Sequence, residues 1–256
     1  MSLLKSYVVV KEGQKIMTNI EEIKKIITNG KRIVIFTGAG ISVPSGIPDF
    51  RSSDGLYNQE SGLNIGPEDI ISHSFFLQNT QEFFKFYKNK MVYQNAMANP
   101  AHKYFASLET PGKSVTVITQ NIDGLHHDAG STNVLELHGS VRRNYCMKCN
   151  KFYTIDSIMQ DDNIPYCNCG GIIKPDVVLY EESLDHKTLI NAINAICLAD
   201  VLIVVGTSLV VNPAASLIRY FSGENLILIN KDKTPYDSLA KYVINDDIIN
   251  VVKQLI

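Results

Sequence analysis

Short apolar runs rich in β-branched residues alternate along the chain with helical patterns. The apolar runs cover residues 32–37, 115–119, 134–137, 201–205 and 226–230. The helical patterns cover residues 19–29, 80–97, 100–108, 186–197, 213–222 and 246–255, and several begin near an Asn, Asp, Thr or Pro. Strands that alternate with helices are typical of a parallel sheet covered by helices. We therefore expect an α/β protein built on one parallel sheet.

The length and charge of the chain limit its class. At 256 residues it is long enough for one large domain with a small insertion. A net charge of −2 and a pI near 6.3 lack the basic excess of a nucleic-acid-binding protein. No apolar run approaches the roughly 20 residues of a membrane span, and the first residues contain no apolar segment of signal length. We expect no direct nucleic-acid partner, no membrane association and a cytoplasmic location, or a nuclear one if the source is eukaryotic.

A glycine-rich segment, GAGISVPSGIPDFR, runs from Gly38 to Arg51 directly after the first apolar run. Glycine lets a backbone approach a phosphate closely, and a helix that begins after such a turn favours negative charge at its N-terminus. The pattern is not a complete G-x-G-x-x-G, so an isolated turn that binds nothing is the alternative. Asp49, Phe50 and Arg51 place a carboxylate, an aromatic ring and a guanidinium beside the turn. This combination favours a cofactor-binding loop.

Four of the five cysteines form two close pairs, Cys146-x2-Cys149 and, after seventeen residues, Cys167-x-Cys169. Two such pairs are typical of a zinc ribbon, in which four thiolates surround the metal. The second pair departs from the usual spacing, because it has one intervening residue rather than two. Free buried cysteines are the alternative. Four thiolates leave no position for water, so we expect the zinc to be structural rather than catalytic.

Polar residues follow several of the predicted strands. They are TQNIDGLH at 119–126, His138-Gly139-Ser140, Gly206-Thr207-Ser208 and Asn230. The carboxyl ends of parallel strands meet at one edge of a sheet, where ligands of open α/β sheets bind. A core histidine with satisfied hydrogen bonds is the alternative for His138, and a turn without a ligand is the alternative for 206–208 and Asn230. The position of His138 beside a second set of polar residues favours a functional role.

The other histidines in these regions have weaker claims to a functional role. We interpret His102 as a residue of a helix start and His126 and His127 as turn residues.

The chain divides into two predicted units. Residues 141–174, rich in Cys, Asn and Asp, interrupt the strand and helix pattern like an insertion, and the Gly-, Ser- and acid-rich residues 52–75 are predicted to form a mobile flap over the cofactor. We assign residues 1–51, 110–140 and 175–256 to a large domain. Residues 52–109 and 141–174 form a small domain that holds the flap and the zinc ribbon.

In their order along the chain, these motifs resemble the sirtuins, the silent-information-regulator family of NAD-dependent protein deacylases. The resemblance rests on GAGISVPSGIPDFR, TQNIDGLH, LHG, the two Cys pairs, PDVVLYEE, GTSLVVNPAA and LIN, and it extends from residue 19 to residue 256. It implies a Rossmann-like doubly wound parallel sheet with a smaller zinc-ribbon and helical domain. NAD, as co-substrate, and an acetyl-lysine protein or peptide would meet between the two domains. The implied products are nicotinamide, O-acetyl-ADP-ribose and the deacetylated lysine.

The resemblance also implies roles for individual residues. His138 and Asn121 would be the catalytic residues, with His138 as the general base and Asn121 facing the ribose hydroxyls and the acyl oxygen. Asp123 would bind the nicotinamide amide. The implied cofactor-binding residues are Gly38, Ala39, Gly40, Ser42, Val43, Ile47, Asp49, Phe50, Arg51, Gln120, Asn121, Ile122, Asp123, Gly206, Thr207, Ser208, Asn230, Asp247 and Ile248. Val178 and Tyr180 would bind the substrate, and Cys146, Cys149, Cys167 and Cys169 would bind zinc. The sequence departs from the common Phe-Gly-Glu at 180–182, where it reads Tyr-Glu-Glu, and this affects the expected peptide preference rather than the reaction.

Two other classes of function share part of this pattern. A nicotinamide-linked dehydrogenase would need an Arg or Lys that polarises the substrate, which the residues at the strand ends do not supply. A non-catalytic NAD-sensing module, with the zinc ribbon as its docking surface, would not need His138-Gly139 or the PDFR loop. Mono-ADP-ribosyl transfer on the same fold is left open.

The distribution of cations predicts the acyl group. No arginine occurs between Arg51 and Arg142, and residues 52–71 contain no lysine. An acidic acyl group such as succinyl needs a cation beside its carboxylate, so we expect neutral acyl groups, acetyl first. The alternative is that Lys85 or Lys88 reaches inward from a helix.

Overall fold

The computed structural model describes residues 7–11, 14–18, 20–50, 55 and 65–256, and its centre is a six-stranded sheet. The strand order is β11-β10-β9-β3-β4-β5, and every neighbouring pair is parallel. The strands are β3 (Arg32–Thr37), β4 (Ser114–Thr119), β5 (Val134–Glu136), β9 (Val201–Val205), β10 (Asn225–Ile229) and β11 (Tyr242–Ile244). Five of these correspond to the predicted apolar runs, which confirms the parallel sheet, whereas the three-residue β11 was not predicted.

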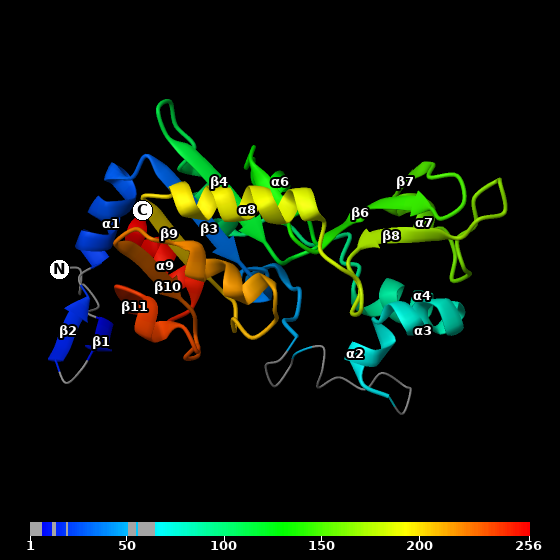
Figure 1. Cartoon of the computed structure of the whole chain (residues 1–256), viewed down its shortest axis with the longest axis horizontal. Coiled ribbons are helices and arrows are strands. Elements are labelled where there is room, and N and C mark those ends of the chain that lie inside the picture. The colour runs from blue at the N-terminus through cyan, green and yellow to red at the C-terminus, as the bar shows by residue number, and fades with distance from the viewer. Residues whose placement is uncertain (1–6, 12–13, 19, 51–54, 56–64) are drawn as a thin grey trace.

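Helices cover both faces of this sheet, as the ribbon shows (Figure 1). Helices α1 (Ile20–Asn29), α5 (Pro100–Ser107) and α9 (Ile248–Leu255) pack on one face, and α8 (His186–Leu198) with the 3-10 helix η4 (Ala214–Tyr220) packs on the other. The side chains of β9 alternate between the two cores, with Ile203 in the first and Leu202 and Val204 in the second. Because both faces are covered, the strand is apolar throughout rather than half polar.

Three predicted segments differ from the structure. The 3-10 helix η4 replaces the expected α-helix at 213–222, and α4 (Thr80–Lys90) ends seven residues earlier than the pattern at 80–97. Helix α5, which lies within the predicted small domain, packs instead against α9 and the large sheet through Ala101 and Phe105. The apolar side chains of α5 face the large sheet, so the helix belongs to the large domain by its packing.

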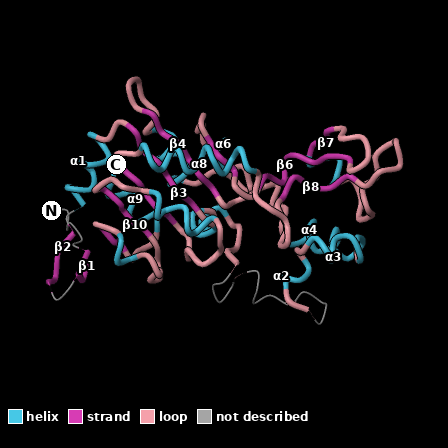
Figure 2. The backbone as a smooth tube through the Cα atoms, in the orientation of Figure 1, coloured by secondary structure: helices cyan, strands magenta, loops and turns pink. Residues whose placement is uncertain are grey.

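A second unit extends from one end of the sheet and is visible in the backbone trace (Figure 2). Its antiparallel sheet has the order β7-β6-β8, formed by β6 (Gly139–Cys146), β7 (Phe152–Thr154) and β8 (Ile173–Val177), with α7 (Ile155–Ile158) beside it. Helices α2 (Pro67–Ile70), α3 (His73–Gln78) and α4 complete the unit. Phe76, Phe83 and Tyr87 share one buried cluster with Cys146 and Cys167. The helical and cysteine-rich parts therefore have a common core.

The remaining described elements are small. Strands β1 (Tyr7–Lys11) and β2 (Gln14–Thr18) form an antiparallel hairpin next to β11, and the short helices are η1 (Ala39–Ile41), η2 (Val43–Ser45), α6 (Leu125–Asp128) and η5 (Asp237–Leu239). Of the predicted flap at 52–75, residues 52–54 and 56–64 lie outside the described residues, and the last part forms α2 and the start of α3. None of the helices in the described ranges has the length and hydropathy that crossing a bilayer requires.

Candidate active site

A cavity of 710 Å³ lies at the carboxyl ends of the parallel strands. Its walls come from the loops after β3, β4, β9 and β10 and from the segment after β8 of the second unit. Eighteen of the predicted site residues line it, namely Gly38, Ala39, Gly40, Val43, Asp49, Phe50, Gln120, Asn121, Ile122, His138, Val178, Tyr180, Gly206, Thr207, Ser208, Asn230, Asp247 and Ile248. The fold thus brings together residues that are more than 200 positions apart in the chain.

A second cavity of 60 Å³ adjoins the first. Ala39, Pro48, Phe50, Met91, Asn121 and Ile122 line both cavities. The predicted residues Ser42, Ile47 and Asp123 line only the smaller one. Arg51 lies outside the described residues, so its predicted role has no structural counterpart here.

The glycine-rich loop is held against the loop after β9. The Gly40 amide donates to the Gly206 carbonyl over 2.8 Å, and a Cβ atom on Gly206, whose φ is +59°, would touch the backbone of Gly40 and Ile41. After β3 the chain forms the short 3-10 helices η1 and η2 rather than an α-helix. The amides of Gly38, Gly40, Ile41 and Ser42 all donate to backbone carbonyls, so these bonds hold the turn without a long helix behind it.

Ser42, Asn121 and Asp123 form a hydrogen-bonded group beside the smaller cavity. The buried Ser42 hydroxyl donates to Asp123 Oδ2 over 2.7 Å and accepts from the Asn121 amide over 3.0 Å. Asp123 Oδ1 accepts from the Leu125 backbone N–H over 2.8 Å. These bonds fix the carboxylate and the amide relative to each other, so a polar ligand in the smaller cavity meets preoriented groups.

His138 lies between β5 and β6, in the wall of the larger cavity. Its Nδ1 is 2.9 Å from the Gln120 carbonyl oxygen, which can only accept, so Nδ1 carries the proton and Nε2 is the basic nitrogen. Burial lowers the pKa of His138, and the bond to Gln120 opposes this shift. Gly139 has φ +75°, and a Cβ there would collide with the Asp176 carbonyl oxygen. His138 is therefore held as a neutral imidazole with one nitrogen able to accept a proton.

The segment after β8 crosses from His138 to the helices of the second unit. The Val178 amide donates to the His138 carbonyl over 3.0 Å. The Tyr180 amide donates to Ile71, and the His73 amide donates to the Tyr180 carbonyl, each over 3.0 Å. Residues 177–182 all line the larger cavity. The segment thus forms part of the cavity wall with its backbone, and the Glu182 amide closes a turn at its end by donating to the Leu179 carbonyl over 3.0 Å.

The structure gives other predicted residues local partners. Asp247 caps α9 by accepting from the Ile249 amide over 2.8 Å and forms an ion pair with Lys231 at 3.0 Å. The Asn230 side-chain amide donates to the Asp232 carbonyl over 2.8 Å, which is the turn-forming role left open for this residue. Both residues still line the cavity.

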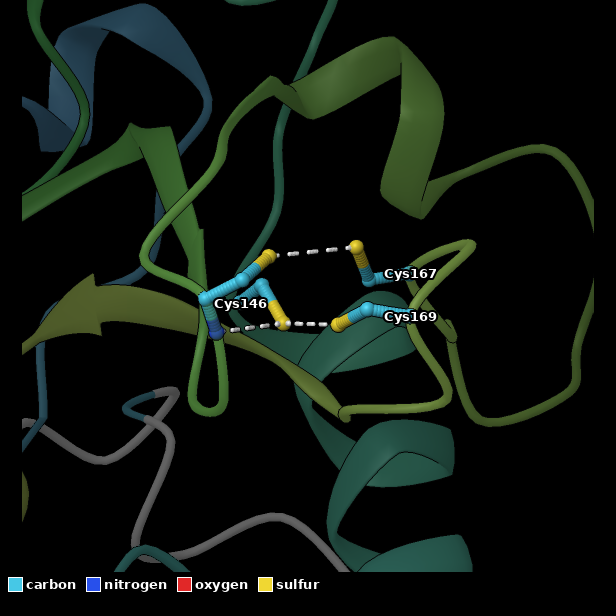
Figure 3. Close-up of side chains that lie close together, drawn as sticks. Cys146, Cys167 and Cys169 are labelled. Carbon is cyan, nitrogen blue, oxygen red and sulfur yellow. Dashed lines mark hydrogen bonds between the residues drawn. The ribbon is translucent and has the colours of Figure 1, made fainter.

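The four paired cysteines meet at one point (Figure 3). Their sulfur atoms all lie within 4.8 Å of one another, with 3.4 Å between Cys146 and Cys169 and 3.6 Å between Cys149 and Cys167. A tetrahedral Zn(S)4 centre has sulfur atoms about 3.8 Å apart, as follows from Zn–S bonds of about 2.3 Å. Backbone N–H groups of Lys148 and Cys149 point at the Cys146 sulfur, as in a zinc knuckle. The donor set fits a structural zinc ion.

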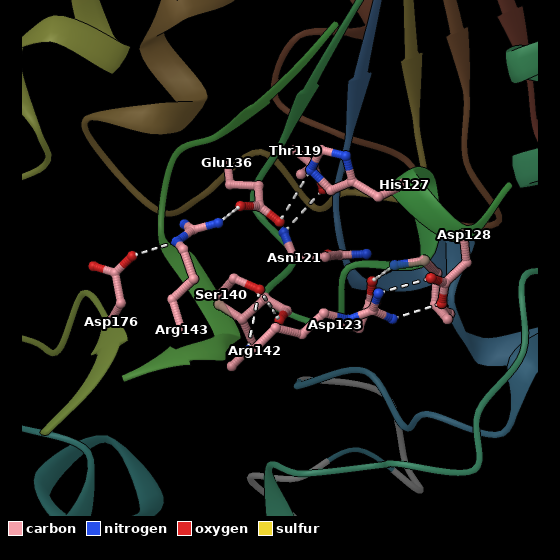
Figure 4. Close-up of polar contacts among 12 residues, drawn as sticks. Thr119, Asn121, Asp123, His127, Asp128, Glu136, Ser140, Arg142, Arg143 and Asp176 are labelled. Carbon is pink, nitrogen blue, oxygen red and sulfur yellow. Dashed lines mark hydrogen bonds and ion pairs between the residues drawn. The ribbon is translucent and has the colours of Figure 1, made fainter. Parts of the chain in front are cut away.

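Ion pairs connect the two units near the site (Figure 4). Arg143 on β6 bridges Glu136 of the large sheet, at 2.5 Å, and Asp176 of β8, at 2.7 Å. Arg142 binds Asp128 through both guanidinium Nη atoms, and this bond lowers the pKa of Asp128. These contacts hold the start of β6, and with it the position of the cavity wall.

His102 is the third residue of α5, which confirms its interpretation as a helix-start residue, and its side chain is buried. His126 is buried in α6 and hydrogen-bonds Thr37 over 3.0 Å, and its ring packs edge-on against the buried His102. His127, also in α6, lies 3.6 Å from Glu136. The interpretation of His126 and His127 as turn residues was wrong because the chain after Gly124 forms one helical turn.

Sequence reasoning missed several residues of the cavity walls. Met91, Leu184, Val211, Lys231 and Lys233 line the larger cavity, and Lys90 and Tyr93 line the smaller one. Lys231 and Lys233 lie within three residues after Asn230 at a strand end, which was an available signal. The others come from segments without a motif.

Comparison with known proteins places this site in context. A family model described as the Sir2 family matches residues 38–213. The chain is 54% identical to an NAD-dependent protein deacetylase of Clostridium perfringens, over 93% of this chain and 98% of the relative, and 50% identical to one of Staphylococcus aureus strain NCTC 8325, over 93% and 98%.

Solved structures show the same likeness. A Sir2–p53 peptide–NAD+ structure matches with a TM-score of 0.79 at 37% identity, over 93% of this chain and 97% of the other. A Sir2 homolog–NAD complex matches with a TM-score of 0.82 at 39% identity, over 92% and 91%.

Proposed function

The chain belongs to the Sir2 family, and on this premise we propose that it is an NAD-dependent protein deacetylase that acts where the two cavities adjoin. The observation that carries this proposal is the position of His138. A neutral imidazole with one basic nitrogen stands in the wall of a cavity that the glycine-rich loop and residues 177–182 also line. A base of this kind can accept a proton from a sugar hydroxyl at neutral pH.

The larger cavity has the groups that NAD requires. We assign the glycine-rich loop and Thr207 and Ser208 to the phosphates, and Asn230 and Asp247 to the adenosine end. The smaller cavity, with Asp123 held by Ser42, suits the nicotinamide carboxamide, because an oriented carboxylate accepts from an amide N–H. When bound, NAD supplies a leaving group, nicotinamide, and a ribose that receives the acyl group.

Each residue then has a defined task. Asn121 stands at the wall shared by both cavities and is oriented by Ser42, so it can donate to a ribose or acyl oxygen. His138 accepts the ribose hydroxyl proton at Nε2, because Nδ1 is held by the Gln120 carbonyl. Partial burial of the site strengthens these polar interactions.

The acetyl-lysine chain is assigned to the wall formed by Val178 and Tyr180. This wall joins the His138 carbonyl at one end and the α3 helix at the other, so a peptide lying along it places its side chain near both cavities. The four cysteines would hold zinc and keep the second unit folded, with no open coordination position for chemistry. We also propose the cytoplasm as the location, with no nucleic-acid or membrane partner, from the charge and hydropathy of the sequence.

A single reaction tests the proposal. The zinc-loaded protein is incubated with NAD and an acetyl-lysine peptide, and the products are identified by mass spectrometry. We expect equal amounts of deacetylated peptide, nicotinamide and O-acetyl-ADP-ribose, and none without NAD. Free acetate released without NAD consumption, or an increase in near-ultraviolet absorbance from reduced cofactor, would contradict the assignment.

A further inference from the structure

Glu181 has a backbone conformation that is unusual for its residue type. Its φ is +73°, and the other non-glycine residues of the described ranges with positive φ are Asn150 and Leu209. A side chain with a Cβ is disfavoured in the left-handed region, which glycine adopts freely. A residue that stays in this region is held by its surroundings, and such positions cluster at functional sites.

The surroundings that hold Glu181 are the first turn of α3. Its Oε2 accepts from the Ser74 backbone N–H over 2.8 Å and from the Ser74 hydroxyl over 2.5 Å. Ser74 lies 107 positions earlier in the chain. The neighbouring Glu182 accepts from His73 over 2.8 Å and from the Leu179 amide over 2.9 Å. Two consecutive carboxylates thus join the segment after β8 to the start of α3.

The segment is therefore fixed at both ends. The Val178 amide is bound to the His138 carbonyl at one end, and Glu181 is bound to Ser74 at the other. Between these points the backbone bonds of Tyr180 with Ile71 and His73 continue the connection. Residues 178–182 line the larger cavity, whereas Asn230 and Asp247 line it from the far end of the sheet. Loss of the Glu181–Ser74 bonds would thus disturb residues 178–182 and leave the adenosine end of the cavity unchanged.

We propose that Glu181 is a positioning residue that ties the peptide-binding segment 178–182 to α3 and so sets the affinity for the acetylated peptide. The inference rests on the proposed function. It differs from a role in capping α3 alone, because a cap would stabilise the helix without a selective effect on peptide binding.

Three variants test this role. Glu181→Gly removes the carboxylate in a residue that adopts the observed φ without strain, Glu181→Gln keeps the reach of the side chain, and Ser74→Ala removes one of the two donors. The control is Asp185→Asn, because Asp185 makes the same pair of bonds, to the Thr188 N–H and hydroxyl at 2.7 Å each, at the start of α8.

We expect Glu181→Gly to raise KM for the acetyl-lysine peptide by roughly three- to tenfold, which is the range for the net loss of one hydrogen bond at an exposed position. KM for NAD and kcat should change less than about twofold, because the Glu181–Ser74 bonds involve neither the residues assigned to NAD nor His138. Glu181→Gln should recover part of the peptide affinity, and Ser74→Ala should add little to Glu181→Gly in the double variant. Asp185→Asn should leave both KM values unchanged.

An unchanged peptide KM in Glu181→Gly, or equal increases for peptide and NAD, would overturn the proposal. Amide hydrogen exchange at His73 and Tyr180 provides a readout that does not depend on turnover. Exchange should be faster in Glu181→Gly than in the wild type. Equal rates would show that Glu181 does not hold residues 178–182 against α3. If the wild type does not deacetylate the peptide, the proposed function fails, and the exchange rates still decide whether Glu181 holds the segment.

Discussion

Two buried histidines make the stability of this protein depend on pH. His102 in α5 and His126 in α6 have ring centroids 4.8 Å apart. His126 Nε2 bonds Thr37, while His126 Nδ1 and both nitrogens of His102 have no hydrogen-bond partner within the described ranges. Burial lowers the pKa of His102 to about 4 and that of His126 to about 3, and for His126 the charge of His102 adds to the shift. The carboxylates of Asp123 and Asp128 oppose the shift of His102.

The sign of the effect follows from linkage. In the unfolded chain both histidines take up a proton near pH 6.5, while in the folded chain they stay neutral until about pH 4 or below. The unfolded state therefore binds more protons in this window. Their contribution to stability is complete above pH 6.5 and is lost as the pH falls toward 4. Between pH 7.5 and pH 5.0, His102 alone should lower the free energy of unfolding by about 2 kcal/mol, since one pH unit below the unfolded pKa corresponds to about 1.4 kcal/mol.

The assay is urea unfolding at pH 7.5 and pH 5.0 with excess zinc. We expect His102→Phe, which keeps an aromatic ring but cannot be protonated, to reduce the pH-dependent loss of unfolding free energy by about 2 kcal/mol relative to the wild type. His186→Phe, at an exposed position of α8, is the control and should leave the loss unchanged. The same loss in His102→Phe and wild type would refute the reasoning.

Three further predictions concern the site. His138→Ala should lower kcat by on the order of 10²–10⁴ with NAD binding retained, and near wild-type turnover of the variant would exclude His138 as the base. Because burial lowers the pKa of His138, kcat of the wild type should fall only as the pH drops below about 6.5. Replacing Cys146 or Cys167 by Ala should unfold the second unit and abolish activity. After a chelator has removed zinc from the wild type, added zinc should restore its activity and added magnesium should not; full activity of a zinc-free protein would contradict this. Acetyl-lysine should be a better substrate than succinyl-lysine, since Lys88 donates to the carbonyls of Asp161 and Asn163 and Lys85 lines neither cavity. The measurement is kcat/KM on matched peptides. A preference for succinyl-lysine would contradict this and would point to Lys90 of the smaller cavity as the cation that binds the succinyl carboxylate.

The sequence by itself determined the sheet and the positions of its ligand-binding ends. Strands such as β9 are continuous apolar runs of β-branched residues because both faces are covered, and this pattern is local. The polar residues after each run, including His138 and Thr207, could then be placed at one edge, because parallel strands share an edge. The short spacing of the cysteine pairs likewise predicted four converging sulfur atoms. In each case the information lies within a few consecutive residues.

The tertiary structure decided the contacts between distant segments. Helix α5 follows the helical pattern of the small domain in sequence, but it packs on the large sheet because its buried face meets α9. That packing brings His102 against His126, which no local pattern predicts. Ser42 joins Asp123 across 81 positions, and Glu181 joins Ser74 across 107. Such pairs form only where the packing of sheet and helices places two backbones within hydrogen-bond distance, so the fine geometry of the site depends on the whole fold.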